Sequence, residues 1–177
     1  MNPDRKHIKL TRDEVEYMKD WLTKKRMDFN TADDYDYHEQ LNIPKDVWLA
    51  NSFGGELAFC KLFGCYPGFD FRKRIRFDTW YRGRKIEIKT NHIHWGEDSW
   101  LKVKNVDYIH EKKTAPDFFC LMIGVLPEYW LGGFVTPEKL LVPENLMQLP
   151  GVGADGEERP PFYQMHLKEL DPRITTE

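Results

Sequence analysis

The chain has 177 residues, of which 41% are hydrophobic and 31% charged, and its formal net charge is −3. These values are typical of a globular protein with one domain, long enough to bury about two-thirds of its unfolded surface. No apolar run approaches the ~20 residues that a membrane helix needs, and the polar N-terminus lacks a signal-peptide core. We therefore expect a single cytoplasmic domain over residues 1–177, with its core in the range 44–145, a polar C-terminal tail and no membrane partner.

Cysteine and charge usage refine this expectation. Cys60, Cys65 and Cys120 are an odd set without metal-ligand spacing, so we expect buried thiols in a reducing compartment. Residues 71–90 contain eight Lys or Arg against two Asp or Glu, whereas the segments on both sides are acidic. A solvated charged hairpin would account for this basic block, and so would a surface that attracts a polyanion.

The first predicted element is an amphipathic helix over residues 11–29. Thr11 followed by Glu14 is the spacing of a capping box, and Val15 and Met18 begin an apolar stripe. Residues 31–43 are acidic and without period, which predicts an exposed loop.

A second, largely buried helix is predicted from Pro44 to Phe63, with Gly64 as its C-terminal stop. Gly54 and Gly55 lie in its middle, where each costs roughly 1 kcal/mol relative to alanine. The pair indicates either a break or close packing, or else a space that leaves the Glu56 carboxylate facing a cleft.

The segment 69–90 is predicted to form a β-hairpin with Arg82-Gly83 as its two-residue turn, followed by a loop over 91–98. That loop places Asp78 directly opposite Glu87, with Cβ atoms roughly 4.5–5.5 Å apart. Lys89 is two residues beyond Glu87 and shares its face. Apolar residues alternate in both strands: Ile75 and Phe77 in the first, Ile86 and Ile88 in the second. This alternation places the apolar side chains on the core face, and the side chains of Asp78, Glu87 and Lys89 on the opposite face.

Two acids and a lysine aimed at one point predict a metal site. Mg²⁺ suits such oxygen donors, to which the Ile88 carbonyl adds another.

Further strands are predicted over 100–106, 117–126 and 129–136, the second buried on both faces, followed by a short helix from Pro137. A loop over 148–160 precedes an edge strand at 162–167. The order of elements predicts one α/β domain around a mixed sheet flanked by helices.

Asp78, the Glu87-Ile88-Lys89 strand and the helical Glu56 together resemble the PD-(D/E)xK nuclease superfamily. The runs 53–61, 86–90 and 132–140 are similar to those of its small phage and bacterial members, and the resemblance covers roughly residues 10–170. It implies a restriction-endonuclease-like core and a Mg²⁺-dependent DNA nuclease, with Mn²⁺ as an alternative metal. Asp78, Glu87 and the Ile88 carbonyl would bind the metal, Glu56 would position metal or water, and Lys89 would assist the attacking water. Phe77 departs from the proline of the family pattern.

The expected partner is DNA, whose phosphates the basic residues would contact: Arg74, Arg76, Arg82, Arg84, Lys85, Lys102 and Lys104. The sequence does not decide whether a protein partner supplies targeting or whether the chain forms a homo-oligomer. The alternative hypothesis is a non-catalytic nucleic-acid-binding or protein-interaction module on the same fold, and a third hypothesis is an RNase with the same site. His92 and His94 are expected as surface loop residues, and the aromatic residues near the basic block as packing groups of a sheet rather than base-stacking groups.

Overall fold

The computed structural model describes residues 5–25, 45–65, 77–93, 96–104, 116–148, 158 and 160–174. Its centre is a five-stranded mixed sheet in the order β1-β6-β5-β3-β2, in which β3 and β5 are parallel and the other neighbours antiparallel. The strands are β1 (His7–Lys9), β2 (Thr79–Tyr81), β3 (Arg84–Asn91), β5 (Phe118–Val125) and β6 (Glu128–Val135). The predicted α/β class and the mixed sheet are thus confirmed, and β1 is an addition that the sequence pattern did not indicate.

A second sheet has three antiparallel strands in the order β4-β8-β7, namely β4 (Trp100–Lys104), β7 (Leu146–Met147) and β8 (Phe162–His166). Two expectations are therefore wrong. The domain contains two sheets instead of one, and the strand predicted at 162–167 lies between two partners instead of at an edge. A five-residue strand carries no local signal for the number of its neighbours, because pairing depends on segments far away in the chain.

The helices are α1 (Arg12–Lys25), α3 (Lys45–Phe63) and α5 (Pro137–Leu140). α3 runs without interruption through Gly54 and Gly55, so a break between two helices is excluded. In the described part of the chain no helix is long and apolar enough to cross a membrane. The expected loop 31–43 and most of the expected loop 148–160 lie outside the described residues, as do the side chains of Arg74, Ile75, Arg76, His94 and Trp95.

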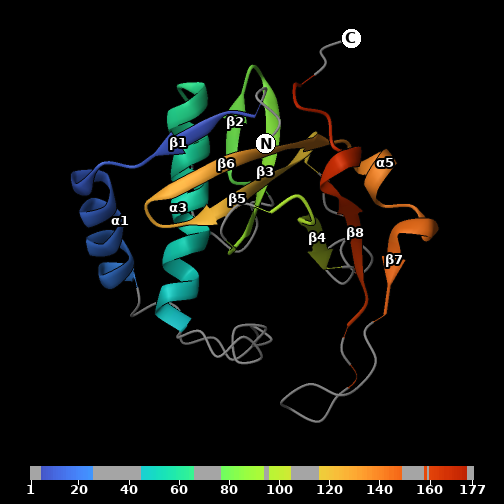
Figure 1. Ribbon diagram of the computed structural model, residues 1–177, viewed down its shortest axis with the longest axis horizontal. Coiled ribbons are helices and arrows are strands. Elements are labelled where there is room, and N and C mark those ends of the chain that lie inside the picture. Colours follow the sequence, from blue (N-terminus) through green and yellow to red (C-terminus); the bar gives the residue numbers. More distant parts are fainter. Residues whose placement is uncertain are drawn as a thin grey trace.

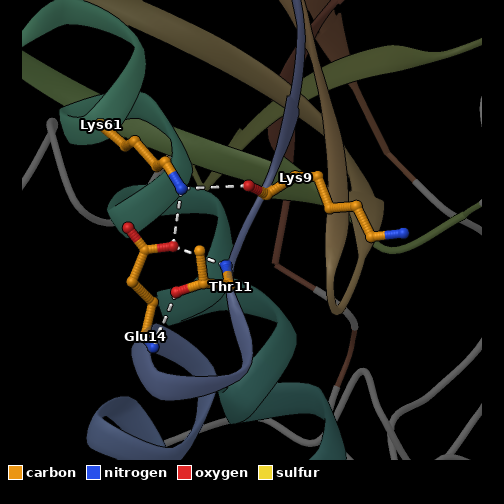
Figure 2. Close-up of polar contacts among 4 residues, drawn as sticks. All are labelled: Lys9, Thr11, Glu14 and Lys61. Atoms are coloured by element: carbon orange, nitrogen blue, oxygen red, sulfur yellow. Dashed lines mark hydrogen bonds and ion pairs between the residues drawn. The ribbon is translucent and has the colours of Figure 1, made fainter.

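The start of α1 is the predicted capping box, and it also joins α1 to α3 (Figure 2). The Glu14 N–H donates to Thr11 Oγ1 at 3.3 Å, and the Thr11 N–H donates to Glu14 Oε2 at 2.6 Å. Lys61 of α3 then donates to the same Glu14 oxygen at 2.7 Å and to the Lys9 carbonyl at 3.1 Å. One lysine therefore connects β1, α1 and α3.

Two hydrophobic cores lie on opposite faces of the main sheet. Figure 1 shows α1 and α3 on one side of it and the second sheet with α5 on the other. The first core joins α3, through Ala58 and Phe59, to the even-numbered residues of β3 and β5, among them Ile86 and Cys120. The second joins the odd-numbered residues of β5 to β4, β8 and α5; it contains Leu101, Val103, Phe119, Leu121, Ile123, Val135, Leu140, Met165, Leu167 and Leu170. The face that carries Glu87 is thus also a packed face of the sheet, not an open one.

Candidate functional site

The β2–β3 hairpin has the predicted register. Thr79 pairs with Ile86, and Tyr81 pairs with Arg84 across the turn. Arg82 and Gly83 have φ angles of 51° and 74°, the positive values that a two-residue turn between twisted strands requires. Because the side chains alternate, this register turns Thr79 and Ile86 toward α3.

Asp78 lies directly before β2 and completes the edge of β3 with its side chain. Its N–H donates to the Ile86 carbonyl at 2.9 Å, and its Oδ2 accepts from the Ile88 N–H at 2.5 Å. The carboxylate thus occupies the position where the backbone of β2 would continue. In an antiparallel pair a residue directs its N–H and C=O to the same side, so the Ile88 carbonyl also faces this edge. A carboxylate and a main-chain carbonyl therefore lie side by side.

The side chains of Glu87 and Lys89 extend from the face of β3 opposite to Ile86, beside Phe119 and Leu121 of β5. The Lys89 ammonium donates to Glu87 Oε1 at 2.6 Å, and both side chains are largely buried, at 13% exposure for Glu87 and 32% for Lys89. A pair so short and so little exposed is stronger than a surface ion pair, because water screens it less.

Among the described residues, the acids Glu56, Asp78 and Glu87 lie near Lys89. Burial and the neighbouring Glu87 charge together raise the pKa of Asp78 to about 8. Lys89 and the hydrogen bond from the Ile88 N–H oppose that rise only in part. Burial likewise raises the pKa of Glu56 well above its ordinary value, and Asp78 and Glu87 add to the effect while Lys89 lowers it. The four side chains are thus close enough to set one another's charge, and these three acids, when ionised, carry more negative charge than Lys89 neutralises.

The glycine pair of α3 explains how Glu56 reaches this cluster. A Cβ on Gly55 would lie 2.1 Å from Thr90 Oγ1, and one on Gly54 would lie 2.1 Å from the Tyr129 hydroxyl. These two side chains also hold the helix, because Thr90 Oγ1 donates to the Ser52 carbonyl at 3.2 Å and the Tyr129 hydroxyl donates to the Asn51 carbonyl at 3.0 Å. The absence of side chains at Gly54 and Gly55 therefore explains both the close packing of α3 on the sheet and the approach of Glu56 to it.

The described members of the predicted DNA-contacting set lie on the hairpin and on β4. Arg82 and Arg84 are exposed at the hairpin turn, at the opposite end of β3 from Lys89. Lys102 and Lys104 are exposed on the face of β4 that points away from the second core. Lys85 is half-buried, with its ammonium 5.8 Å from the ring centres of Phe77 and Trp80.

The aromatic residues around this hairpin differ from the expectation in two places. Phe77 is half-buried and packs edge-on against Trp80, with ring centres 5.1 Å apart, instead of entering the core. Trp80 is 53% exposed, whereas Tyr81 packs inward on Phe59 and Phe63. Side chains alternate as predicted along β3 but not before β2, because the regular pairing begins only at Thr79.

His92 was expected to lie at the surface, but its ring packs inward against α3. Its Nε2 lies 3.0 Å from Ser52 Oγ, its ring meets the Trp48 ring edge-on at 5.2 Å, and burial lowers its pKa to about 4. The imidazole is therefore neutral near pH 7. The alternation of β3 continued past Thr90 would have indicated this inward position.

Among the described residues, no group of three or more His, Cys, Asp and Glu side chains is arranged to hold a metal ion. Mg²⁺ is commonly bound by only one or two carboxylates, with water and substrate phosphate completing its shell. The oxygen donors of Asp78, Glu87 and the Ile88 carbonyl, beside a cluster with surplus negative charge, fit such an ion in chemical kind. Comparisons of the chain with protein-family models, with curated proteins and with solved structures gave no match.

Proposed function

We propose that the protein is a metal-dependent nuclease that hydrolyses phosphodiester bonds in DNA, and that its mixed sheet with α3 is a restriction-endonuclease-like core. The observation that carries the proposal is the cluster of Glu56, Asp78 and Glu87 around Lys89, in which burial and mutual repulsion raise the pKa of Asp78. Strongly perturbed carboxyl groups beside a specific charge partner are characteristic of catalytic and metal sites.

In this proposal Asp78, Glu87 and the Ile88 carbonyl bind Mg²⁺ or Mn²⁺, with Glu56 as an additional ligand or a group that positions water. The bound metal would lower the pKa of a water molecule and neutralise charge on the scissile phosphate. Lys89, held by Glu87 at 2.6 Å, orients the attacking water by hydrogen bonding. Thr90 and Tyr129 act indirectly, because they hold the stretch of α3 that carries Glu56.

The basic residues contact the phosphate backbone without reading bases. The described members of this set are the exposed Arg82 and Arg84 at the turn, the half-buried Lys85 on β3, and Lys102 and Lys104 on β4. Such contacts support structure-directed or non-specific cleavage, and a protein partner would supply any targeting.

The test is incubation of the purified full chain with supercoiled, linear, branched and single-stranded DNA, and with RNA, in the presence of Mg²⁺ or Mn²⁺. Glu87→Gln and Asp78→Asn should each reduce DNA cleavage by at least ~100-fold, and Lys89→Ala by ~100-fold or more, while circular dichroism shows a folded chain. Matched controls are Glu138→Gln and Lys168→Ala, exposed changes of the same kind on other elements, which should cleave like the wild type. Full activity of Glu87→Gln would refute the site.

The alternative is a non-catalytic nucleic-acid-binding or protein-interaction module. It is favoured by the Lys89–Glu87 contact, since Lys89 already supplies one positive charge to the acids. Tight DNA binding without cleavage of any substrate, unaffected by Glu87→Gln, would support that module. Cleavage of RNA alone would indicate an RNase with the same site.

A further inference from the structure

Cys60 and Cys65 are brought together at the C-terminal end of α3. The helix ends at Phe63, Gly64 has a φ of 63°, and the Cys65 N–H donates to the Cys60 carbonyl at 3.0 Å. This bond across a left-handed glycine is the Schellman arrangement, in which the side chains at its two ends come into contact. Standard bond lengths then keep the two Cα atoms less than about 7 Å apart, the separation above which a disulfide cannot form.

The two thiols interact with each other. Cys60 is 2% exposed within the first core, and Cys65 packs half-buried against the same core. The thiols form a hydrogen bond, and the Thr79 side chain hydrogen-bonds to both. The main-chain bond across Gly64 and this interaction between the thiols place the two cysteines next to each other.

Their environments give them different reactivities. The hydrogen bond from Cys60 lowers the pKa of the Cys65 thiol to about 7, and that same bond, together with burial, raises the pKa of Cys60. The thiolate is the nucleophilic form of cysteine. Cys65 is thus the attacking sulfur and Cys60 the resolving one.

We propose that Cys60 and Cys65 form a reversible intramolecular disulfide when the protein meets hydrogen peroxide. The Cys65 thiolate attacks one peroxide oxygen, the O–O bond breaks, and the released hydroxide takes up a proton to become water, leaving a sulfenic acid on Cys65. Cys60 then loses its proton and attacks the Cys65 sulfur, the S–O bond breaks, and a second water leaves. Two thiols are oxidised and one peroxide is reduced, and a dithiol reductant reverses the change by exchange. This inference is independent of the proposed nuclease activity.

Cys120 is the internal comparison for this reaction. It lies on the central strand β5 with no exposed surface, and burial raises its pKa. We expect it to stay reduced while the pair at the end of α3 reacts.

The experiment uses the reduced full chain, treated with increasing hydrogen peroxide, blocked with an alkylating reagent, digested with trypsin and analysed by mass spectrometry. Lys61 lies between the two cysteines, so trypsin places them in separate peptides, 46–61 and 62–72. We expect these two peptides to be found linked, to separate on treatment with dithiothreitol, and to be found linked in most of the chains before Cys120 is oxidised.

Two variants complete the test. Cys120→Ser should retain the linked peptides, and Cys65→Ser, which changes the less buried member of the pair, should abolish them and leave the Cys60 thiol open to alkylation. The proposal would be overturned by oxidation of Cys65 to sulfinic or sulfonic acid without linkage, by a disulfide that involves Cys120 or a second chain, or by unreacted thiols at peroxide levels that oxidise free cysteine.

Discussion

Two lysine–glutamate pairs of nearly equal length lie in very different surroundings. Lys61 contacts Glu14 at 2.7 Å where α3 meets α1, and Lys89 contacts Glu87 at 2.6 Å at the edge of β3. Burial raises the pKa of Glu14, but the hydrogen bonds from Lys61 and Thr11 outweigh it and lower the pKa overall. At the edge of β3, by contrast, the pKa values of Asp78 and Glu56 are raised, because burial and neighbouring acids outweigh Lys89.

The difference separates a structural pair from a candidate site. At the helix junction every charge has a partner from a different element, and the arrangement holds α1 on α3 (Figure 2). At the edge of β3 two further acids surround a pair that is already complete, which costs stability when they ionise. A cation or a cationic partner would relieve that cost, which is why the second region, and not the first, is the candidate for function.

The largest expected effect tests the repulsion at the edge of β3. The folded-state pKa of Asp78 is about 8, against 3.8 for an unperturbed aspartate, so the folded state prefers the protonated form. This contribution to stability is fully present below about pH 4 and is lost as pH rises through about 8. Asp78→Asn, which keeps an acceptor for the Ile88 N–H, should therefore raise the free energy of unfolding by on the order of 3 kcal/mol above pH 8 and leave it nearly unchanged in acid.

Urea unfolding across this pH range provides the measurement, with Asp98→Asn, whose side chain is 99% exposed, as the matched control that should change little. Adding Mg²⁺ should stabilise the wild type and not Asp78→Asn, because a ligand stabilises only the state that binds it. If Asp78→Asn were less stable than the wild type at every pH, the Asp78 carboxylate would stabilise the fold. The edge of β3 would then not differ from the helix junction in this respect.

The second prediction concerns the packing that brings Glu56 to the acids. In Gly55→Ala the added methyl group would lie 2.1 Å from Thr90 Oγ1, so the Thr90 side chain or the helix must shift. Overpacking of this kind typically costs 1–3 kcal/mol, and we expect about 2 kcal/mol here. Gly64→Ala is a poor control because of its positive φ, whereas the double variant Gly55→Ala/Thr90→Ser tests the cause directly.

If Oγ1 is the clashing atom, Gly55→Ala/Thr90→Ser, which removes only the threonine methyl group, should be no more stable than Gly55→Ala. Gly55→Ala/Thr90→Ala, which also removes Oγ1, should regain part of the lost stability in thermal unfolding. A Gly55→Ala variant as stable as the wild type would show that α3 does not need this close approach, and Glu56 would then be placed by other contacts.

The smallest effect is expected at the helix junction. Lys61→Met should lower the free energy of unfolding by about 0.5–1 kcal/mol near neutral pH, since the pair is about one-third exposed and partly screened. The Glu14 pKa is depressed, so its stabilising contribution is present above its ordinary value of 4.5 and is lost as pH falls below it. The difference between Lys61→Met and the wild type in urea unfolding should therefore shrink in acid, opposite to the pH trend at Asp78. An equal difference at all pH values would assign the effect to packing of the lysine stem.

Local signals in the sequence accounted for much of the fold. The capping box at Thr11, the end of α3 before Gly64 and the two-residue turn at Gly83 each depend on a few neighbouring residues, and the structure has all three. The hairpin register follows from the turn, so the pairing of Thr79 with Ile86 required no tertiary information. The roles of Asp78 and Glu87 in catalysis stay predictions.

Other features depended on contacts that no local pattern records. The short strands β1 and β7, the central position of β8 and the inward position of His92 were absent from the expectations or different from them. Lys61 reaches Glu14 across 47 residues of sequence, and only the packing of α1 on α3 makes that bond. The amino-acid sequence by itself determined which residues alternate, turn and cap, because those preferences are set by the backbone within one or two turns. The tertiary structure decided how many acids surround one lysine, because charge balance depends on which elements meet in space.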